Sequence, residues 1–369
     1  MAFEDKTLLD MLIAWASSHL ALCDDTHRVK ALEHRSTALR SFTTALPKSQ
    51  ESPEVALACC LVFCSMSAIL GDTAGWHNHL LGAAHIIRQA SPLHSYQAGL
   101  KKISGTYEGR WLLRNFAYHD VLMSVTLNRE PIVAGRYWMQ QTSNEADSYV
   151  GLASEPLAII SDISSLNGHL VQQTGHKSGL RYDLNVVSSA PANAESIEPP
   201  RLGDLGTEEF LSRACDIESE LLNWTCPASD DVQLMNLAEA YRSAALIHLY
   251  RVLRRRTTRT VPDLDNKIRG QVTAVIHHIR QMPLKCLPEC TSLFPLFMAG
   301  GETRSKSDMQ LIRERLQHII TYRHFQNAAS ALSVLEELWL QYTSITEIPG
   351  ELLDWWDILK RRGWSLALS

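Results

Sequence analysis

The feature that most constrains the fold is a helical repeat of apolar residues, which is clearest between residues 293 and 339. An apolar run from Leu293 to Ala299 ends at two glycines. Pro295 near its start is tolerated because the first turn of a helix has N–H groups to spare. A second helix is predicted further on, where apolar residues recur every three or four positions and so share one face. These residues are Ala328, Leu332, Leu335, Leu338 and Trp339.

The same periodicity recurs along most of the chain, and no segment shows the alternation of apolar and polar residues that is typical of strands. The segment 53–70 is apolar almost all round, which is typical of a buried helix. We therefore predict an all-α fold: a large multi-helix domain of packed antiparallel helix pairs with no sheet. The other predicted helices cover residues 7–22, 28–46, 107–127, 155–173, 207–224, 232–256 and 264–282, a helix that begins at Trp76, and a short terminal helix within 352–363.

One long segment breaks this pattern. Residues 174–206 are rich in Gly, Ser, Pro and Asn and show little periodicity, which is typical of a connector. We therefore predict a single all-α domain over residues 1–369, in which 174–206 is a long flexible connector between two helical lobes.

Composition excludes several classes of protein. The chain has 369 residues, 45% of them hydrophobic, which is enough for a large core. Its 35 basic and 40 acidic residues nearly balance, so we expect no direct contact of this chain with nucleic acid. No apolar run reaches the roughly 18 residues of a membrane span, and the start of the chain lacks the basic region of a secretory signal. These features predict a reducing compartment, the nucleus or the cytoplasm.

Three segments resemble the fungal-specific transcription factor domain, which is the regulatory half of zinc-cluster regulators. The first combines an aromatic-Pro-Leu-Phe-x-Ala-Gly-x-Glu segment, an Arg-bearing helix, and an Asn-containing helix that ends in Leu-Glu-Glu-x-Trp. In the second, Gly-Asp precedes Trp-x-x-His-Leu-x-Gly-Ala, and the third is the helical segment 239–251. The matching residues are Phe294 to Gly300, Glu302, Arg313, Arg315, Asn327, Leu335, Glu336, Glu337 and Trp339 in the first segment, and Gly71, Asp72, Trp76, His79, Leu80, Gly82 and Ala83 in the second.

This resemblance implies a helical, nuclear domain that often dimerises. Some members of the family sense small apolar molecules in a cavity between helices, and abundant aromatic and apolar helix faces suit such a cavity. We therefore expect a ligand-responsive regulatory domain with a small apolar metabolite as its ligand and a homodimer as its assembly. The residues expected to bind the ligand are Trp76, Phe294, Phe297, Met298, Leu335 and Trp339.

The cysteines exclude the DNA-binding module of that family from this sequence. The module needs six cysteines in Cys-x-x-Cys pairs, and none of the eight cysteines of this chain forms such a pair. Cys60 and Cys64 are four apart, as are Cys286 and Cys290. Because free cysteine behaves as a small apolar residue, we favour buried thiols over a zinc site in both cases. We predict no metal site and no cofactor.

A run of arginines ends the predicted helix 232–256 and continues beyond it. It is open to two interpretations, a nuclear-import signal or phosphate contact and a solvated helix end. The second is favoured, because cations are stabilised near the C-terminus of a helix. The run consists of Arg251, Arg254, Arg255, Arg256 and Arg259.

The alternative function is that of a stand-alone enzyme of secondary metabolism. No nucleophile elbow, dinucleotide-binding glycine pattern or phosphate loop occurs, so such an enzyme would carry out a cofactor-free cyclisation or isomerisation of an apolar metabolite. His77, His85 and Glu302 are the catalytic candidates. The two histidines lie eight positions apart on one predicted helix. For Glu302, a capping contact through Arg313 or Arg304 is preferred to catalysis.

Overall fold

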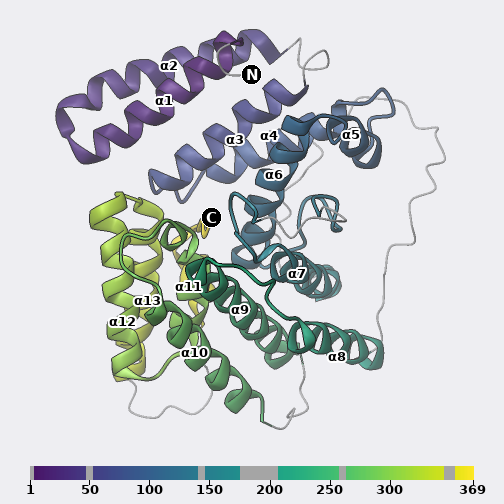
Figure 1. The fold of residues 1–369 in the computed structure, drawn as a ribbon, viewed down its shortest axis with the longest axis vertical. Coiled ribbons are helices and arrows are strands. Elements are labelled where there is room, and N and C mark those ends of the chain that lie inside the picture. The colour runs from purple at the N-terminus through teal and green to yellow at the C-terminus, as the bar shows by residue number, and fades with distance from the viewer. Residues whose placement is uncertain (1–3, 47–52, 140–145, 175–206, 257–262, 345–353) are drawn as a thin grey trace.

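The computed structural model describes residues 4–46, 53–139, 146–174, 207–256, 263–344 and 354–369. Within these ranges the regular structure is helical, and the only β-type pairing is an isolated bridge between Asp147 and Gly151. The predicted all-α fold is confirmed. Neighbouring helices pack as antiparallel pairs, seen best in α1 with α2 and in α9 with α10 (Figure 1).

The N-terminal half of the molecule lies at the top of Figure 1, where α1 packs on α2 and α3, and α4 packs on α3 and α5. Asp5, Ser95 and Thr106 cap three of its helices, since each side chain accepts a backbone N–H from the first turn. The elements are α1 (Lys6–Cys23), a short 3₁₀ turn (Asp25–His27), α2 (Arg28–Ala45), α3 (Pro53–Ile69), α4 (Trp76–Gln89), α5 (Tyr96–Ile103) and α6 (Tyr107–Thr126).

The C-terminal half packs below it, with α9, α10 and α11 in contact with one another and α13 against both α11 and α14. Its elements are α7 (Ser154–Thr174), α8 (Thr207–Asn223), α9 (Val232–Arg256), α10 (Leu264–Gln281), a 3₁₀ segment (Leu287–Thr291), α11 (Leu293–Glu302), α12 (Lys306–His318), a π-helical turn (Ile319–Arg323), α13 (Gln326–Ser344) and α14 (Trp355–Arg362).

The buried side chains form two hydrophobic clusters, one in each half. Helix α3 is the centre of the first, with 12 of its 17 residues buried, as its uniformly apolar sequence predicts. Helix α6 contributes to both clusters: Leu113 and Phe116 belong to the first, and Ala117 and Val121 to the second. It therefore joins the two halves.

The predicted connector lies almost entirely outside the described residues, which resume at 207. Helices on either side of that gap, α7 before it and α9 after it, pack against each other in the second cluster. The division of the domain into lobes at 174–206 stays a prediction.

Two glycines give a matched test of this packing. A Cβ at Gly99 in α5 would lie 1.7 Å from the carbonyl oxygen of Ile87 in α4, whereas a Cβ at Gly270 in α10 would meet nothing within 4 Å. We expect Gly99→Ala to lower the free energy of unfolding by about 2 kcal/mol or more, as overpacking does. We expect Gly270→Ala to raise it by about 0.5–1 kcal/mol, through helix propensity alone. Urea denaturation of both variants tests the packing of α5 on α4, and equal effects would contradict it.

Candidate functional site

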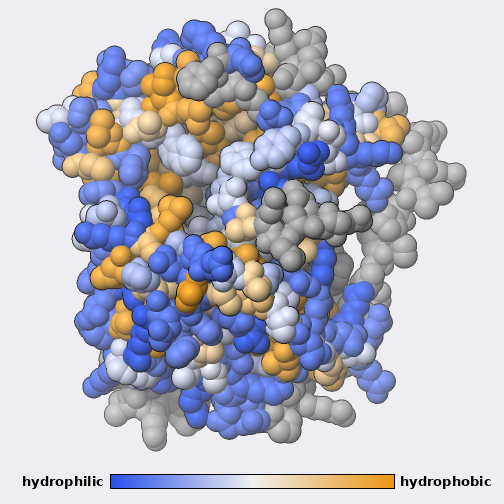
Figure 2. All heavy atoms as spheres, viewed as in Figure 1, coloured by the Kyte–Doolittle hydropathy of each residue, from blue (hydrophilic) through white to orange (hydrophobic). Residues whose placement is uncertain are grey.

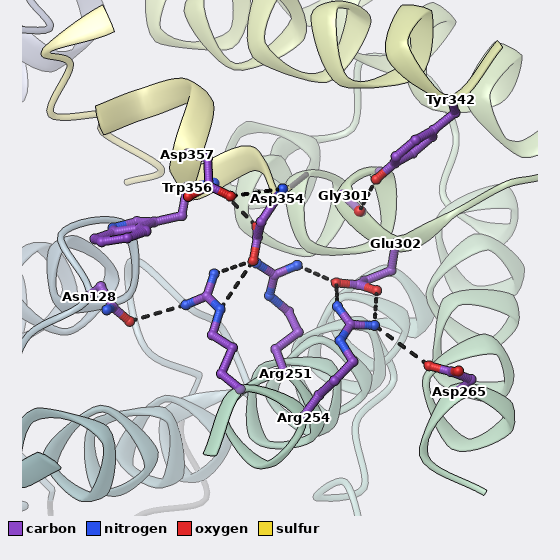
Figure 3. A network of polar contacts seen from close by, with 12 residues as sticks. Asn128, Arg251, Arg254, Asp265, Gly301, Glu302, Tyr342, Asp354, Trp356 and Asp357 are labelled. Carbon is purple, nitrogen blue, oxygen red and sulfur yellow. Dashed lines mark hydrogen bonds and ion pairs between the residues drawn. The ribbon is translucent and has the colours of Figure 1, made fainter. Parts of the chain in front are cut away.

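A group of five charged side chains ties three helix ends together. Arg251, Arg254 and Arg255 lie on the last turns of α9, Glu302 ends α11, and Asp354 caps the N-terminus of α14 (Figure 3). We call these five residues the arginine network. The Arg251 guanidinium bonds to both carboxylates, Arg254 bonds to Glu302 at 2.8 and 3.0 Å, and Arg255 bonds to Asp354.

The centre of the network is buried, so the expectation of a solvated helix end is wrong for Arg251. The side chains of Arg254 and Arg255 are 32% and 30% exposed, and Arg259 lies outside the described residues. The Arg251 side chain is 4% exposed and its guanidinium lies 4.6 Å from the centre of the Trp355 ring. Burial by itself would raise the pKa of Asp354, but the charges of Arg251 and Arg255 outweigh it and hold this pKa well below its ordinary value. Asp354 is thus held as an anion beside a buried cation, and Glu302 bonds to the same guanidinium.

A cavity of about 370 Å³ opens beside the network, between α9, α11 and α14. Its wall carries four arginines and three carboxylates, so most of its charge is already paired. Tyr342 donates its hydroxyl to the carbonyl of Gly301 at 3.3 Å, and the Arg304 guanidinium stacks 3.1 Å from the centre of the Tyr342 ring. The groups in this cavity satisfy one another, which favours a structural role.

A second cavity, of about 300 Å³, lies between α6, the first turn of α7 and the segment that joins α8 to α9. We call it the aromatic cavity, because two tryptophans, a tyrosine and a methionine form much of its wall. Its lining residues are Tyr107, Arg114, Trp138, Met139, Ala146, Asp147, Ser148, Gly151, Leu152, Ser154, Glu155, Trp224 and Pro227.

One ion pair organises the polar side of the aromatic cavity. Arg114 Nε lies 3.1 Å from Asp147 Oδ2, and both side chains are largely buried. The other oxygen of Asp147 accepts the backbone N–H groups of Tyr149 at 2.8 Å and Val150 at 3.2 Å, which shapes the turn into α7. The Asp147 carboxylate is therefore occupied, while Arg114 has four further N–H groups beyond Nε. Within the described part of the chain, the buried Trp138 indole N–H has no partner.

The side chains predicted to bind a ligand are core residues. Trp339 donates its indole N–H to the carbonyl of Gly300 at 2.9 Å, and the Phe294 ring packs 5.6 Å from that of Tyr241. None of the six lines the aromatic cavity or the cavity beside the arginine network. Their role as ligand contacts stays a prediction. The six residues are Trp76, Phe294, Phe297, Met298 and Leu335, all at 0% exposure, and Trp339 at 4%.

The three catalytic candidates are not brought together. His85 is exposed, whereas His77 is half-buried, which lowers its pKa, and its Nδ1 has no partner among the described side chains. Glu302 forms ion pairs with Arg251 and Arg254 instead of the expected capping contact through Arg313 or Arg304. The expected partners are engaged elsewhere, since Arg313 pairs with Glu336.

Sequence reasoning missed the aromatic cavity because more than half of its lining lies between the predicted helices 107–127 and 155–173, where no periodicity predicts an element. Within 128–150, Trp138 is 6% exposed and Val150 is 2% exposed. A tryptophan followed by a methionine inside a polar segment was the available signal. Arg114 and Asp147 gave none, since an ion pair between residues 33 positions apart has no local pattern.

Two buried histidines have lowered pKa values and are therefore held in the neutral form. Burial lowers the pKa of His119 to about 4, and burial together with the charges of Arg251 and Arg255 lowers that of His248 to about 3. His248 Nε2 lies 3.3 Å from Ser164 Oγ, so it joins α9 to α7 as a neutral ring.

A comparison with known protein families gives a match over the whole chain. The family model described as "Fungal specific transcription factor domain" matches residues 1–369. The chain belongs to this family. The match confirms the resemblance of the three sequence segments. No curated protein and no solved structure matches the chain.

Two further features of this fungal transcription factor domain bear on its partners. Among the described residues, no helix has both the length and the apolar composition that a membrane crossing requires. Figure 2 shows hydrophobic side chains on the upper part of the face drawn, where α1 and α2 lie. The predicted homodimer stays a prediction. The large apolar side chains exposed on these two helices are Leu9, Ile13, Leu20, Val29, Leu32 and Leu39.

Breaking the arginine network should destabilise the domain. Glu302→Gln removes one of the two carboxylates that neutralise Arg251, and loss of a buried ion partner costs about 3–5 kcal/mol. The matched control is Glu336→Gln, whose partly exposed pair with Arg313 is worth less than about 1 kcal/mol. Urea denaturation measures both. A loss for Glu302→Gln as small as that of the control would contradict the structural role.

The lowered pKa of His248 predicts acid sensitivity. Its pKa rises on unfolding from about 3 towards the ordinary value of about 6.5, so the unfolded chain takes up a proton that the folded chain excludes. This stability is present above pH ~6.5 and is lost as the pH falls, by about 1.4 kcal/mol per pH unit. Unfolding free energies of wild type and His248→Gln, measured from pH 7 to 4.5, should converge as the pH falls. Parallel curves would contradict a neutral buried His248.

Proposed function

We propose that this chain is the ligand-responsive regulatory domain of a fungal transcription regulator. The observation that carries the proposal is the family match over residues 1–369. The family also supports a nuclear location. DNA binding belongs to another part of such a regulator, because this sequence lacks Cys-x-x-Cys pairs and its basic and acidic residues nearly balance.

The aromatic cavity is the proposed ligand site. Its volume of about 300 Å³ lies at the lower end of the range for small-molecule sites, and its walls combine aromatic side chains with several polar and charged groups. Tryptophan presents a flat aromatic surface to a planar ligand, and methionine adds a flexible, polarizable one. These properties fit the small apolar metabolite expected from the sequence. The proposed site is not on helices 293–302 and 326–344, where most of the predicted ligand contacts lie.

Charge narrows the class of ligand further. The lining carries one cation, Arg114, against the carboxylates of Asp147 and Glu155, so a ligand anion would meet a net negative wall. A neutral planar molecule with an acceptor oxygen suits the site better, because the remaining N–H groups of Arg114 would donate to that oxygen. The cyclase or isomerase alternative gains no support, since its three catalytic candidates lie apart from this cavity.

Filling the cavity should abolish ligand binding. Ala146 lines the cavity and is exposed, so Ala146→Trp adds bulk without disturbing the core, and Ala134→Trp at an exposed position outside the cavity is the control. The probe is 6-propionyl-2-(dimethylamino)naphthalene, a neutral aromatic ketone whose fluorescence reports an apolar environment. We expect saturable binding to the wild type and to Ala134→Trp, and at least roughly tenfold weaker binding to Ala146→Trp. Equal binding to both variants would exclude the aromatic cavity as the site.

Regulation is tested separately in cells. The chain fused to a heterologous DNA-binding domain should activate a reporter to an extent that changes with growth condition. Ala146→Trp should remove that change and Ala134→Trp should retain it. Absence of activation under every condition would contradict the regulatory function, whatever the probe binds.

A further inference from the structure

Residues 364–369 lie where the N-terminal half (α1 to α6) meets the C-terminal half (α7 to α14). We call this boundary the seam. The segment follows α14 with no regular structure, and the C-terminus in Figure 1 lies between the upper and lower helices. Its side chains alternate: Leu366 and Leu368 belong to the hydrophobic cluster of the C-terminal half, and Ala367 to that of the N-terminal half. Such alternation is what an extended chain produces, since successive side chains point to opposite sides. The segment is packed by both halves at once.

Side chains from both halves bond to the backbone of this segment. Trp76 Nε1 donates to the carbonyl of Ser365 at 2.6 Å, and Thr126 Oγ1 donates to that of Leu366 at 2.9 Å. On the opposite side, Asn327 Nδ2 donates to the carbonyl oxygens of Ala367 at 3.4 Å and of Ser369 at 3.1 Å. Four carbonyl groups in five consecutive residues are therefore held by side-chain donors.

A backbone–backbone bond and a histidine complete the contact. The N–H of Ser365 donates to the carbonyl of Thr73 at 2.7 Å. The ring of His119 lies between two hydroxyls, with Nδ1 2.6 Å from Ser369 Oγ and Nε2 3.0 Å from Ser65 Oγ. The ring is buried and therefore bridges α3, α6 and the segment as a neutral group.

Two of the donors bond to the segment alone. Trp76 Nε1 and Asn327 Nδ2 donate only to carbonyl oxygens of residues 365–369, whereas Thr126 Oγ1 also donates to the carbonyl of Met123 at 3.1 Å. Departure of the segment would therefore remove the protein partners of the Trp76 and Asn327 N–H groups, at a cost in free energy unless another occupant or water replaces them. Main-chain hydrogen bonds combined with pockets for alternate side chains are also how binding domains recognise extended peptides. Because the segment contributes no helix or strand, it can leave the seam without unfolding an element.

We propose that the seam is a binding groove for an extended peptide, and that residues 364–369 are its built-in occupant, a latch that holds the two halves together. The hinge is Gly363, whose φ of +64° ends α14 in the left-handed conformation. When the latch is released, the halves remain joined through α6, and the groove takes the same sequence from solution. This goes beyond the proposed function, because the groove is distinct from the aromatic cavity.

The test uses a fluorescent peptide of residues 364–369 and a chain that ends at Gly363. Fluorescence anisotropy should show saturable binding of one peptide per truncated chain and little binding to the intact chain, whose groove is occupied. A peptide carrying Leu366→Asp and Leu368→Asp should bind at least roughly tenfold more weakly, because both leucines occupy apolar pockets. Peptide binding should also raise the melting temperature of the truncated chain.

A second preparation guards against failure of the truncated chain to fold. A protease site inserted after Gly363 allows the segment to be cut from the folded protein, after which labelled peptide should exchange into the groove. If the truncated or the cut chain binds the native and the doubly substituted peptides equally, the groove proposal is wrong. Failure of probe binding at the aromatic cavity would leave this result unaffected, so the two proposals can be separated.

Discussion

Burial of the Arg251 cation is the interaction on which the arrangement of the C-terminal half depends. A charge that is 3% exposed must be neutralised, and its two carboxylates come from α11 and from the N-cap of α14. The same guanidinium therefore holds the ends of helices α9, α11 and α14 against one another. This packing directs the segment after α14 into the seam, where it is packed by both halves. The need to pair one buried arginine thus also affects how the two halves of the domain are held together.

The residues with the clearest apolar periodicity in the sequence form the hydrophobic core, and the aromatic cavity is lined by other residues. Phe294, Phe297 and Leu335 are fully buried because a continuous apolar face is best covered by another helix. The aromatic cavity is instead built where α6 and α7 are joined by irregular chain, around the pair Arg114–Asp147. Rigid helices that position loop residues are a common arrangement for binding sites. We propose the same arrangement here: the apolar helix faces form the core, and the irregular chain between α6 and α7 forms much of the ligand site.

Much of the fold could be predicted from the sequence, because a helix depends on residues only three or four positions apart. The buried α3 and the capped starts of the helices follow from such local rules. The site could not be predicted in the same way. For Glu302 the sequence suggests a capping contact through the nearby Arg313 or Arg304, whereas its actual partner Arg251 lies 51 positions away. Trp138 was overlooked because no periodicity surrounds it, and the seam depends on contacts such as Asn327 with Ser369, which only the packed helices create.

The most direct test of the account is hydrogen–deuterium exchange of the intact chain with and without the naphthyl ketone probe. If the aromatic cavity is the regulatory ligand site, protection should appear in the first turns of α6 and in residues 146–155, while α11 and α13 remain unchanged. Protection confined to 293–302 and 326–342, with none around Arg114 and Asp147, would contradict it. That result would place the ligand within the helical core that the sequence first indicated.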